Sequence, residues 1–336
     1  MGITLKQIAE MAGVHKSTVD KVIHNRPGVS DAKRQQIRQL LDEYGYESNP
    51  LAKALNYQKK KMAIAVVLPV VDALADLKRG MELVRQDFNS FNFEIQYYEI
   101  PDADAQAKCL RQLCGQKISG VVVGPIEAPA VAEALRALDA AQIPVVTVNS
   151  DLADVPRLCS VRQDEAQSAQ VAARLAGLLL GGKGKLGIIS SHAMRGVVQR
   201  RQVFENYLPQ CWQEVQIAGV EEIQETAEAA YGGASALLGR CPDIDALFIT
   251  CGCVPDICRA VQDKGLSGRL AVICYEKYPA IKELVRNGQV ACTISGNLMT
   301  QGRLAMRLLF EYIIYDRKPE HTNIFVRHEI LFRENI

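Results

Sequence analysis

The feature that most constrains this chain is a pair of short helices joined by a glycine turn near its N-terminus. Thr4 followed by Gln7 has the spacing of a capping box, in which the hydroxyl and the amide each satisfy a free backbone N–H. The helix that starts there ends at Gly13, and a second amphipathic helix is expected over roughly 16–24. Two short helices joined by about four residues around a glycine predict a helix-turn-helix, whose second helix can enter the major groove of DNA.

A third helix and a short helical tail follow. Ser30 is expected as the N-cap of the third helix and Gly45 as its end, with apolar residues at core spacing between them. Asn49-Pro50 then opens a short helical piece, LAKAL, which ends at Leu55 before a basic run. Proline at the first helical position suits such a start.

The stretch from Thr4 to Leu55 resembles the DNA-binding head and hinge helix of the lac-repressor (LacI/GalR) family of bacterial transcription regulators, without a gap. The resemblance implies that the second helix and its flanks meet a DNA operator. Lys16, Ser17 and Lys21 take the positions of base readers, where lysine suits guanine and serine is unselective. Donors suited to phosphates, which position the head without reading sequence, are Thr4, His15, Thr18, Asn25, Ser30 and Asn49.

Leu55 and Ala52 belong to the hinge piece. By itself, a leucine in LAKAL would be a core residue. In the family that the stretch resembles, the equivalent leucine wedges into a central CpG step from the minor groove, and Ala52 is small enough to approach that groove. The resemblance thus implies a homodimer on a pseudo-palindromic operator. Asp20 departs from the small hydroxyl residue that is common at its position, so the motif does not give the operator sequence.

A basic head is joined to a larger, faintly acidic body. Residues 1–61 hold 11 Lys and Arg against 6 Asp and Glu, whereas the remaining residues hold 28 against 32. This asymmetry indicates that only the head meets a polyanion. No apolar run reaches the ~20 residues of a membrane span, and the chain begins directly with an amphipathic helix. A cytoplasmic protein without membrane contact is therefore expected.

After a polar linker that ends near Lys61, buried strands alternate with helices. Runs that predict strands lie at 64–68, 93–99, 118–123, 144–148, 185–190, 214–219, 245–250, 270–275 and 291–295. Strands separated by helices of this length predict doubly wound parallel sheets. There are about twice as many units as one sheet needs, which predicts two lobes.

The order of these elements resembles the type I periplasmic sugar-binding fold, in which the chain crosses between two lobes three times. The resemblance implies crossings near 161, 292 and 322. The predicted fold is thus a small all-α helix-turn-helix head and an α/β body of two doubly wound parallel-sheet lobes. The predicted domains are a DNA-binding domain over 1–48, a hinge helix and linker over 49–61, and an effector-binding and dimerisation domain over 62–336. Lobe 1 takes about 62–161 and 293–322, and lobe 2 takes about 162–292 and 323–336.

Open α/β sheets bind ligands beyond the carboxyl ends of their strands, where loops of the two lobes converge. Polar candidates at these ends are Asp72, Glu127, Asn149 and Asp151 in the first lobe, and Ser191, Arg200, Thr250 and Glu276 in the second. Carboxylates and an arginine around a cleft suit a polyhydroxylated sugar, because each can bond two adjacent hydroxyls. By the resemblance, Arg200 and Glu276 match positions that hold sugar hydroxyls. As alternatives, Asp151 could cap a turn and Glu276 could be a surface charge.

The sequence leaves the effector open. The cleft ends offer few aromatic rings for a sugar to stack on, with Tyr275 and Tyr278 the nearest, and Ser295-Gly296-Asn297 replaces a glutamine that is frequent in the family. A sugar or polyol is expected, with a purine, another small metabolite or a partner protein as the alternative. Closure of the cleft would change the distance between paired hinge segments and so control a repressor.

No motif predicts an enzyme, a cofactor or a metal site. No GxGxxG opens a helix after the first strand, and GGKGK at 181–185 lacks the spacing and the Ser or Thr of a phosphate-binding loop. Cys251-Gly-Cys253 stands out among ten cysteines, but no CxxC pair or histidine completes a zinc-binding spacing. Free thiols in a reducing compartment are expected.

Overall fold

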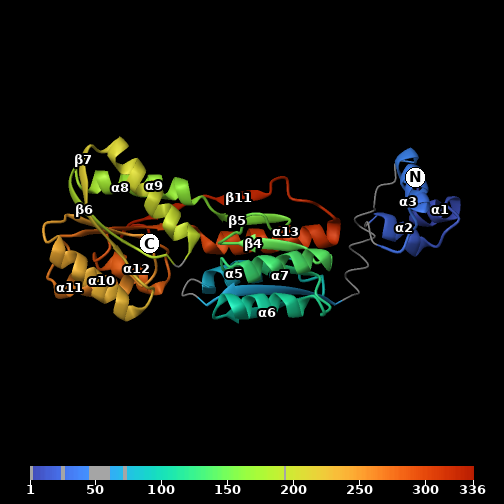
Figure 1. The fold of residues 1–336 in the computed structure, drawn as a ribbon, viewed down its shortest axis with the longest axis horizontal. Helices are drawn as coiled ribbons and strands as arrows, with labels where there is room; N and C mark the ends of the chain where they lie inside the picture. Colours follow the sequence, from blue (N-terminus) through green and yellow to red (C-terminus); the bar gives the residue numbers. More distant parts are fainter. Residues whose placement is uncertain (1–2, 24–26, 45–60, 71–73, 193) are drawn as a thin grey trace. The chain divides into compact units, whose positions relative to one another are not determined.

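The structure is a computed structural model that describes residues 3–23, 27–44, 61–70, 74–192 and 194–336 (Figure 1). The chain divides into two compact units, Met1–Asn56 and Tyr57–Ile336. The first is the helical head, and the second is the α/β body.

The described residues of the head form three helices, α1 (Leu5–Met11), α2 (Lys16–Ile23) and α3 (Asp31–Glu43). The predicted capping box is confirmed, because Thr4 Oγ1 accepts from the Gln7 N–H at 3.4 Å and Gln7 Oε1 accepts from the Thr4 N–H at 2.9 Å. Gly13 makes the turn into α2 with φ 61°, a left-handed conformation that favours glycine. All three helices contribute to one apolar core, formed by Ile8, Ala9, Ala12, Val19, Val22 and Ile37.

The first sheet of the body has six strands in the order β11-β5-β4-β3-β1-β2, all parallel. The strands are β1 (Met62–Pro69), β2 (Phe93–Ile100), β3 (Gly120–Val123), β4 (Val145–Val148), β5 (Cys159–Gln163) and β11 (Asn323–Val326). Helices α6 (Ala103–Leu113) and α7 (Pro129–Ala140) share an apolar cluster with one face of this sheet. Helices α5 (Leu74–Asp87) and α13 (Leu298–Tyr315) pack against each other, and α13 meets the other face at Gly120.

The second sheet has the order β12-β10-β9-β8-β6-β7, with only β12 antiparallel among these strands. The strands are β6 (Lys183–Ser190), β7 (Glu214–Glu222), β8 (Ala246–Ile249), β9 (Ala271–Tyr275), β10 (Cys292–Ser295) and β12 (Glu329–Leu331). One face packs against α8 (Glu165–Leu179) and α9 (Arg195–Cys211). The other packs against α10 (Ala227–Arg240), α11 (Val254–Asp263) and α12 (Pro279–Arg286). The body therefore has the predicted two doubly wound lobes.

The strand pairing corrects two predicted lobe boundaries. Strand β10 is fully buried between β9 and β12 of the second sheet, so the chain crosses after Ser295 and not near 292. Strand β11 pairs with β5 of the first sheet, so the assignment of 323–336 to lobe 2 is wrong for Asn323–Val326. In both cases the chain leaves the sheet only after the strand has paired, and for the buried strand β10 an unpaired end would be costly.

Helices α5 and α13 approach so closely that two contact positions need glycine. A Cβ on Gly80 would lie 2.0 Å from the Met299 carbonyl oxygen, and a Cβ on Gly302 would lie 2.1 Å from the Leu77 carbonyl oxygen. These neighbours are backbone atoms, which cannot turn aside as a flexible side chain can.

Gly302→Ala should lower the free energy of unfolding of the body by about 2–3 kcal/mol, because the two helices must separate. The matched control is Gly232→Ala in α10, where an added Cβ meets nothing within 4 Å. That change should stabilise the protein by up to about 1 kcal/mol, through helix propensity. Urea unfolding measures both, and equal effects of the two substitutions would contradict the close contact.

Candidate DNA interface and interlobe site

Helix α2 of the head presents a polar face to solvent. Lys16, Ser17 and Lys21 are exposed, whereas Val19 and Val22 on the opposite side are buried in the core. The division follows the helical period, since apolar residues three apart fix one face and leave the other accessible. The three predicted base readers therefore lie on a surface that a DNA groove can reach.

The predicted phosphate contacts are distributed around this helix. Thr4, His15 and Ser30 are exposed and Thr18 is half-buried. His15 Nδ1 lies 2.9 Å from Ser17 Oγ and accepts from the Ser17 N–H at 3.3 Å, so the two side chains order the start of α2. Ser30 stands at the N-cap of α3, as predicted, but its hydroxyl makes no capping hydrogen bond. Four predicted DNA contacts lie outside the described residues: Asn25, Asn49, Ala52 and Leu55.

A buried charged cluster occupies the interlobe edge of the second sheet. Arg200 of α9 is 9% exposed, and its Nε donates to Glu165 Oε2 at 2.5 Å. Its Nη1 donates to the Thr250 carbonyl oxygen at 3.3 Å, and its guanidinium carbon lies 4.1 Å from the centre of the Tyr275 ring. Its Nη2 donates to Glu165 Oε1 at 3.4 Å, so three of the five N–H donors of the arginine are used and two remain.

Sequence reasoning missed Glu165 and Gln163, which lie on either side of the first crossing. Gln163 ends β5 and its Nε2 donates to both Glu165 carboxylate oxygens, at 3.1 and 3.0 Å. Gln163 Oε1 is buried and has no hydrogen-bond partner within the described part of the chain. A glutamate at the first position of a helix is common as a partner of the helix dipole, so the sequence held no signal for its pairing with Arg200.

Glu276 follows β9 with a left-handed backbone, φ 75°. Its N–H donates to the Ile294 carbonyl oxygen at 3.0 Å, and its own carbonyl oxygen accepts from Thr293 Oγ1 at 2.6 Å. These bonds fix the residue between β9 and β10. Burial raises the pKa of the Glu276 carboxyl to about 7, although Arg200 acts to lower it. Near neutral pH the group can therefore donate a hydrogen bond as well as accept one.

Glu276 also lines a small cavity of about 120 Å³ formed by elements of both lobes. Asp76 of α5 contributes from the first lobe, and Tyr278, Lys282 and Ser295 contribute from the second. The cavity therefore offers carboxyl, ammonium and hydroxyl groups within one small space, a chemistry suited to a ligand with several hydroxyls.

Four other predicted effector contacts lie within the described residues, Thr250 and Ser191 in the second lobe and Glu127 and Asn149 in the first. Thr250 is fully buried, with its Oγ1 donating to Ser190 Oγ at 2.9 Å, and Ser191 Oγ donates to Glu225 Oε1 at 2.5 Å. Glu127 is exposed, and Asn149 is half-buried with φ 65° directly after β4. Asp72 lies outside the described residues.

Asp151, predicted as an effector contact, is hydrogen-bonded within the first lobe. Its Oδ1 accepts from Thr147 Oγ1 at 2.8 Å and its Oδ2 accepts from Arg157 Nη2 at 2.6 Å. Both carboxylate oxygens are thus used within the first lobe, which agrees with the alternative of a turn-stabilising residue. The structure brings Arg200, Thr250 and Glu276 together and places Asp151 in a separate ion pair.

The described residues contain no group of three or more His, Cys, Asp or Glu side chains that could hold a metal ion. The ten cysteines form no disulfide bonds, and burial raises the pKa of the Cys251 and Cys258 thiols. In the part of the chain that the structure covers, no helix combines the length and the apolar character needed to cross a bilayer.

Comparison with known proteins gives two family matches. Residues 64–316 match the family described as a periplasmic binding protein domain, and residues 4–49 match the lacI family of bacterial regulatory proteins. Catabolite control protein A from Priestia megaterium is 23% identical over 100% of this chain and 99% of its own. The transcriptional regulator GalS from Salmonella typhimurium is 26% identical over 99% of this chain and 98% of its own. The crystal structure of GanP, a glucose-galactose binding protein from Geobacillus stearothermophilus, covers 83% of this chain and 99% of its own, with a TM-score of 0.74 and 19% identity.

Glu276→Gln should change how stability depends on pH. The folded-state pKa of about 7 lies above the ordinary value of 4.5, so folding favours the protonated acid. The free energy of unfolding of the wild type should therefore fall as the pH rises from about 4.5 to about 7, and should level off above that. Glutamine does not titrate, so the variant should gain on the order of 1–2 kcal/mol relative to wild type between about pH 5 and about pH 8. Urea unfolding across this range measures the difference, and parallel curves would contradict the raised pKa.

Proposed function

We propose that this chain, which belongs through residues 64–316 to the periplasmic binding protein domain family, is a regulator of the lacI family that binds a specific DNA operator under the control of a small polyhydroxylated effector. The observation that carries the proposal is the division of α2, which exposes Lys16, Ser17 and Lys21 while its apolar residues fill the core. A helix that is polar on its outer face and anchored on its inner face meets the requirement for reading base edges in the major groove.

We propose a pseudo-palindromic operator with a central CpG step, bound by a homodimer. Two heads related by a two-fold axis read two half-sites, since the symmetry of the protein sets that of the DNA. Leu55 from each subunit would enter the central step from the minor groove, with Ala52 beside it. Thr4, His15, Thr18, Asn25, Ser30 and Asn49 would contact phosphates. The dimer surface would lie on the body, where the helices within 73–90 and 277–287 are candidates.

For the effector, we propose a sugar or polyol held at the interlobe cluster. Arg200 retains two donors, and Glu276 can donate or accept, so the pair can bond adjacent hydroxyls that carry both functions. GanP, with the same body fold, is described as a glucose-galactose binding protein, which supports this class of ligand. A purine, another small metabolite or a partner protein is the alternative, because few aromatic rings lie at this edge.

The proposed control is a population shift between two lobe arrangements. An effector that bonds groups of both lobes binds the closed arrangement more tightly, and closure would alter the spacing of the paired hinge segments. Such coupling between two sites is worth about 1–3 kcal/mol in typical allosteric proteins. We propose repression as the outcome, in the cytoplasm where the operator lies.

Selection from randomised duplex DNA tests the operator proposal directly. The purified full-length chain should retain a pseudo-palindrome centred on CG, because two heads and two wedge leucines act together. Selection is repeated with a panel of sugars, polyols and purines, and a compound that changes the retained fraction identifies the effector class. No enrichment in any of these conditions would reject the operator proposal.

Lys21→Ala should weaken operator binding by about tenfold to a hundredfold and relax the preference at one base position in each half-site. The matched control is Lys264→Ala, which removes an exposed lysine at the end of α11 in the body. Fluorescence anisotropy with the selected operator and its single-base variants measures both effects. Equal weakening on every sequence, with a smaller salt dependence, would show that Lys21 contacts a phosphate instead of a base.

A further inference from the structure

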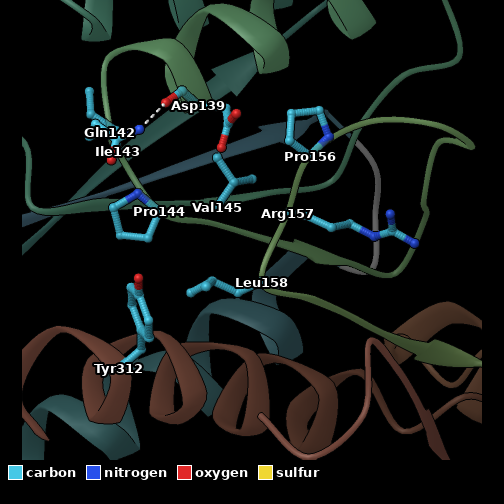
Figure 2. Close-up of a pocket in the computed structure, with 9 residues that line it drawn as sticks. All are labelled: Asp139, Gln142, Ile143, Pro144, Val145, Pro156, Arg157, Leu158 and Tyr312. Carbon is cyan, nitrogen blue, oxygen red and sulfur yellow. Dashed lines mark hydrogen bonds between the residues drawn. The ribbon is translucent and has the colours of Figure 1, made fainter. Parts of the chain in front are cut away.

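A second cavity lies at the opposite edge of the first sheet from the interlobe site. It has a volume of about 260 Å³ and is formed by the turn between α7 and β4, the loop that leads into β5, and α13 (Figure 2). Val145 begins β4 and Leu158 directly precedes β5, so this is the N-terminal edge of parallel strands. Leu298, at the start of α13, lines the interlobe cavity. Tyr312 lies fourteen residues further along the same helix, or ~21 Å at the rise of an α-helix.

Five of the nine residues that line this cavity are apolar. Ile143 and Val145 are buried beneath it, and Pro144, Pro156 and Leu158 complete the lining. Figure 2 shows the Tyr312 ring rising from α13 with its hydroxyl toward Pro144. The planar tyrosine ring can stack on a flat aromatic ligand, and the proline rings have little conformational freedom to lose on contact. The volume is near the lower end of ligand pockets, which fits a ligand of about ten non-hydrogen atoms.

The electrostatics of the cavity favour a cation. Asp139 lies in the last turn of α7 and Tyr312 in the last turn of α13, so two helix C-termini, each equivalent to a partial negative charge of roughly half a unit, meet at the cavity. The Asp139 carboxylate is exposed and makes no hydrogen bond or ion pair with the residues that the structure describes. The Tyr312 ring face also attracts cations.

Nearby cationic side chains do not neutralise this charge. Arg157 lines the cavity with its stem, but its guanidinium extends away from Tyr312 and is paired with Asp151 at 2.6 Å (Figure 2). Arg136, also on α7, donates to the Asp154 carbonyl oxygen at 3.4 Å. The Gln142 amide donates to the Asp139 carbonyl oxygen and leaves the carboxylate untouched.

We propose that this cavity is a second ligand site, separate from the interlobe site, which binds a small flat aromatic molecule bearing an ammonium or amidinium group. The cationic group pairs with the Asp139 carboxylate, and the ring packs on Tyr312 between Pro144 and Pro156. The site is independent of the effector proposed above, since it uses different residues at the other edge of the sheet.

Benzamidine is a suitable probe, because its charge and its ring can be varied separately. Titration of the full-length chain, followed by ligand-observed NMR, should give saturable binding with a dissociation constant on the order of 1 mM, as expected for a ligand of this size. Benzamide, which is neutral, benzoate, which is anionic, and cyclohexanecarboxamidine, which lacks the aromatic ring, should each bind at least about tenfold more weakly.

Asp139→Asn should weaken benzamidine binding by about tenfold, through loss of the charged hydrogen bond. Glu133→Gln removes another exposed carboxylate from the same helix and should leave the affinity unchanged. Both variants should keep the wild-type melting temperature, since both positions are exposed. Absence of saturable binding, equal binding of benzamide, or an unchanged affinity of Asp139→Asn would overturn the proposal. Loss of benzamidine binding in Glu276→Gln would place the probe in the interlobe cavity and would also overturn it.

Discussion

The buried ion pair between Arg200 and Glu165 is the interaction on which the interlobe edge depends. Both side chains are almost fully buried, so each requires the other, and removal of one partner from such a pair typically costs about 3–5 kcal/mol. Glu165 opens α8 directly after the first crossing, and Arg200 lies in α9 of the second lobe. Gln163, at the end of a strand of the first lobe, donates to both Glu165 oxygens. The pair thereby joins the first crossing, α9 and the ends of β5 and β8.

Side-chain hydrogen bonds also link the second and third crossings to neighbouring segments. Asn297 Nδ2 donates to Glu329 Oε1 at 3.0 Å, and Lys277 forms an ion pair with the same carboxylate. His328 Nε2 lies 3.1 Å from the Asp164 carbonyl oxygen, so the third crossing is bonded to the first. Burial lowers the pKa of His328, which keeps it a neutral donor at physiological pH. These directional bonds lie at the crossings and outside the apolar clusters of the two lobes.

Much of this architecture follows from local sequence signals. The capping box at Thr4, the glycine turn at Gly13 and the apolar strand runs each reflect a local backbone requirement, and each was predictable. The lobe assignment of β10 and β11 was not, because strand pairing is decided by neighbours far apart in the sequence. The same reason applies to the site. Arg200 and Glu276 were predicted as candidates from their places near strand ends and from the family resemblance, but Glu165 became visible only when the fold placed it beside Arg200.

The pairing of Asp151 with Arg157 also could not be predicted from sequence position. Its position after β4 predicted a ligand contact, yet Arg157, six residues later, takes the carboxylate. Sequence position gives the edge of the sheet on which a residue lies, but it does not give the competition among nearby side chains for that residue. A carboxylate with a partner on each oxygen, such as Asp151, has fewer acceptor positions left for a ligand than the Asp139 carboxylate, which has no partner among the described residues.

The protonation of Glu276 shows which of several opposing forces dominates at the interlobe edge. Helix N-termini lie at this edge, and their dipoles favour a carboxylate by about 0.3–1 kcal/mol, less than one pKa unit. Arg200 favours the carboxylate as well, but its own charge is largely balanced by Glu165. Burial outweighs both and raises the pKa to about 7. Near neutral pH Glu276 can therefore take up or release a proton at little cost, so its carboxyl can act as a hydrogen-bond donor or as an acceptor at the same position.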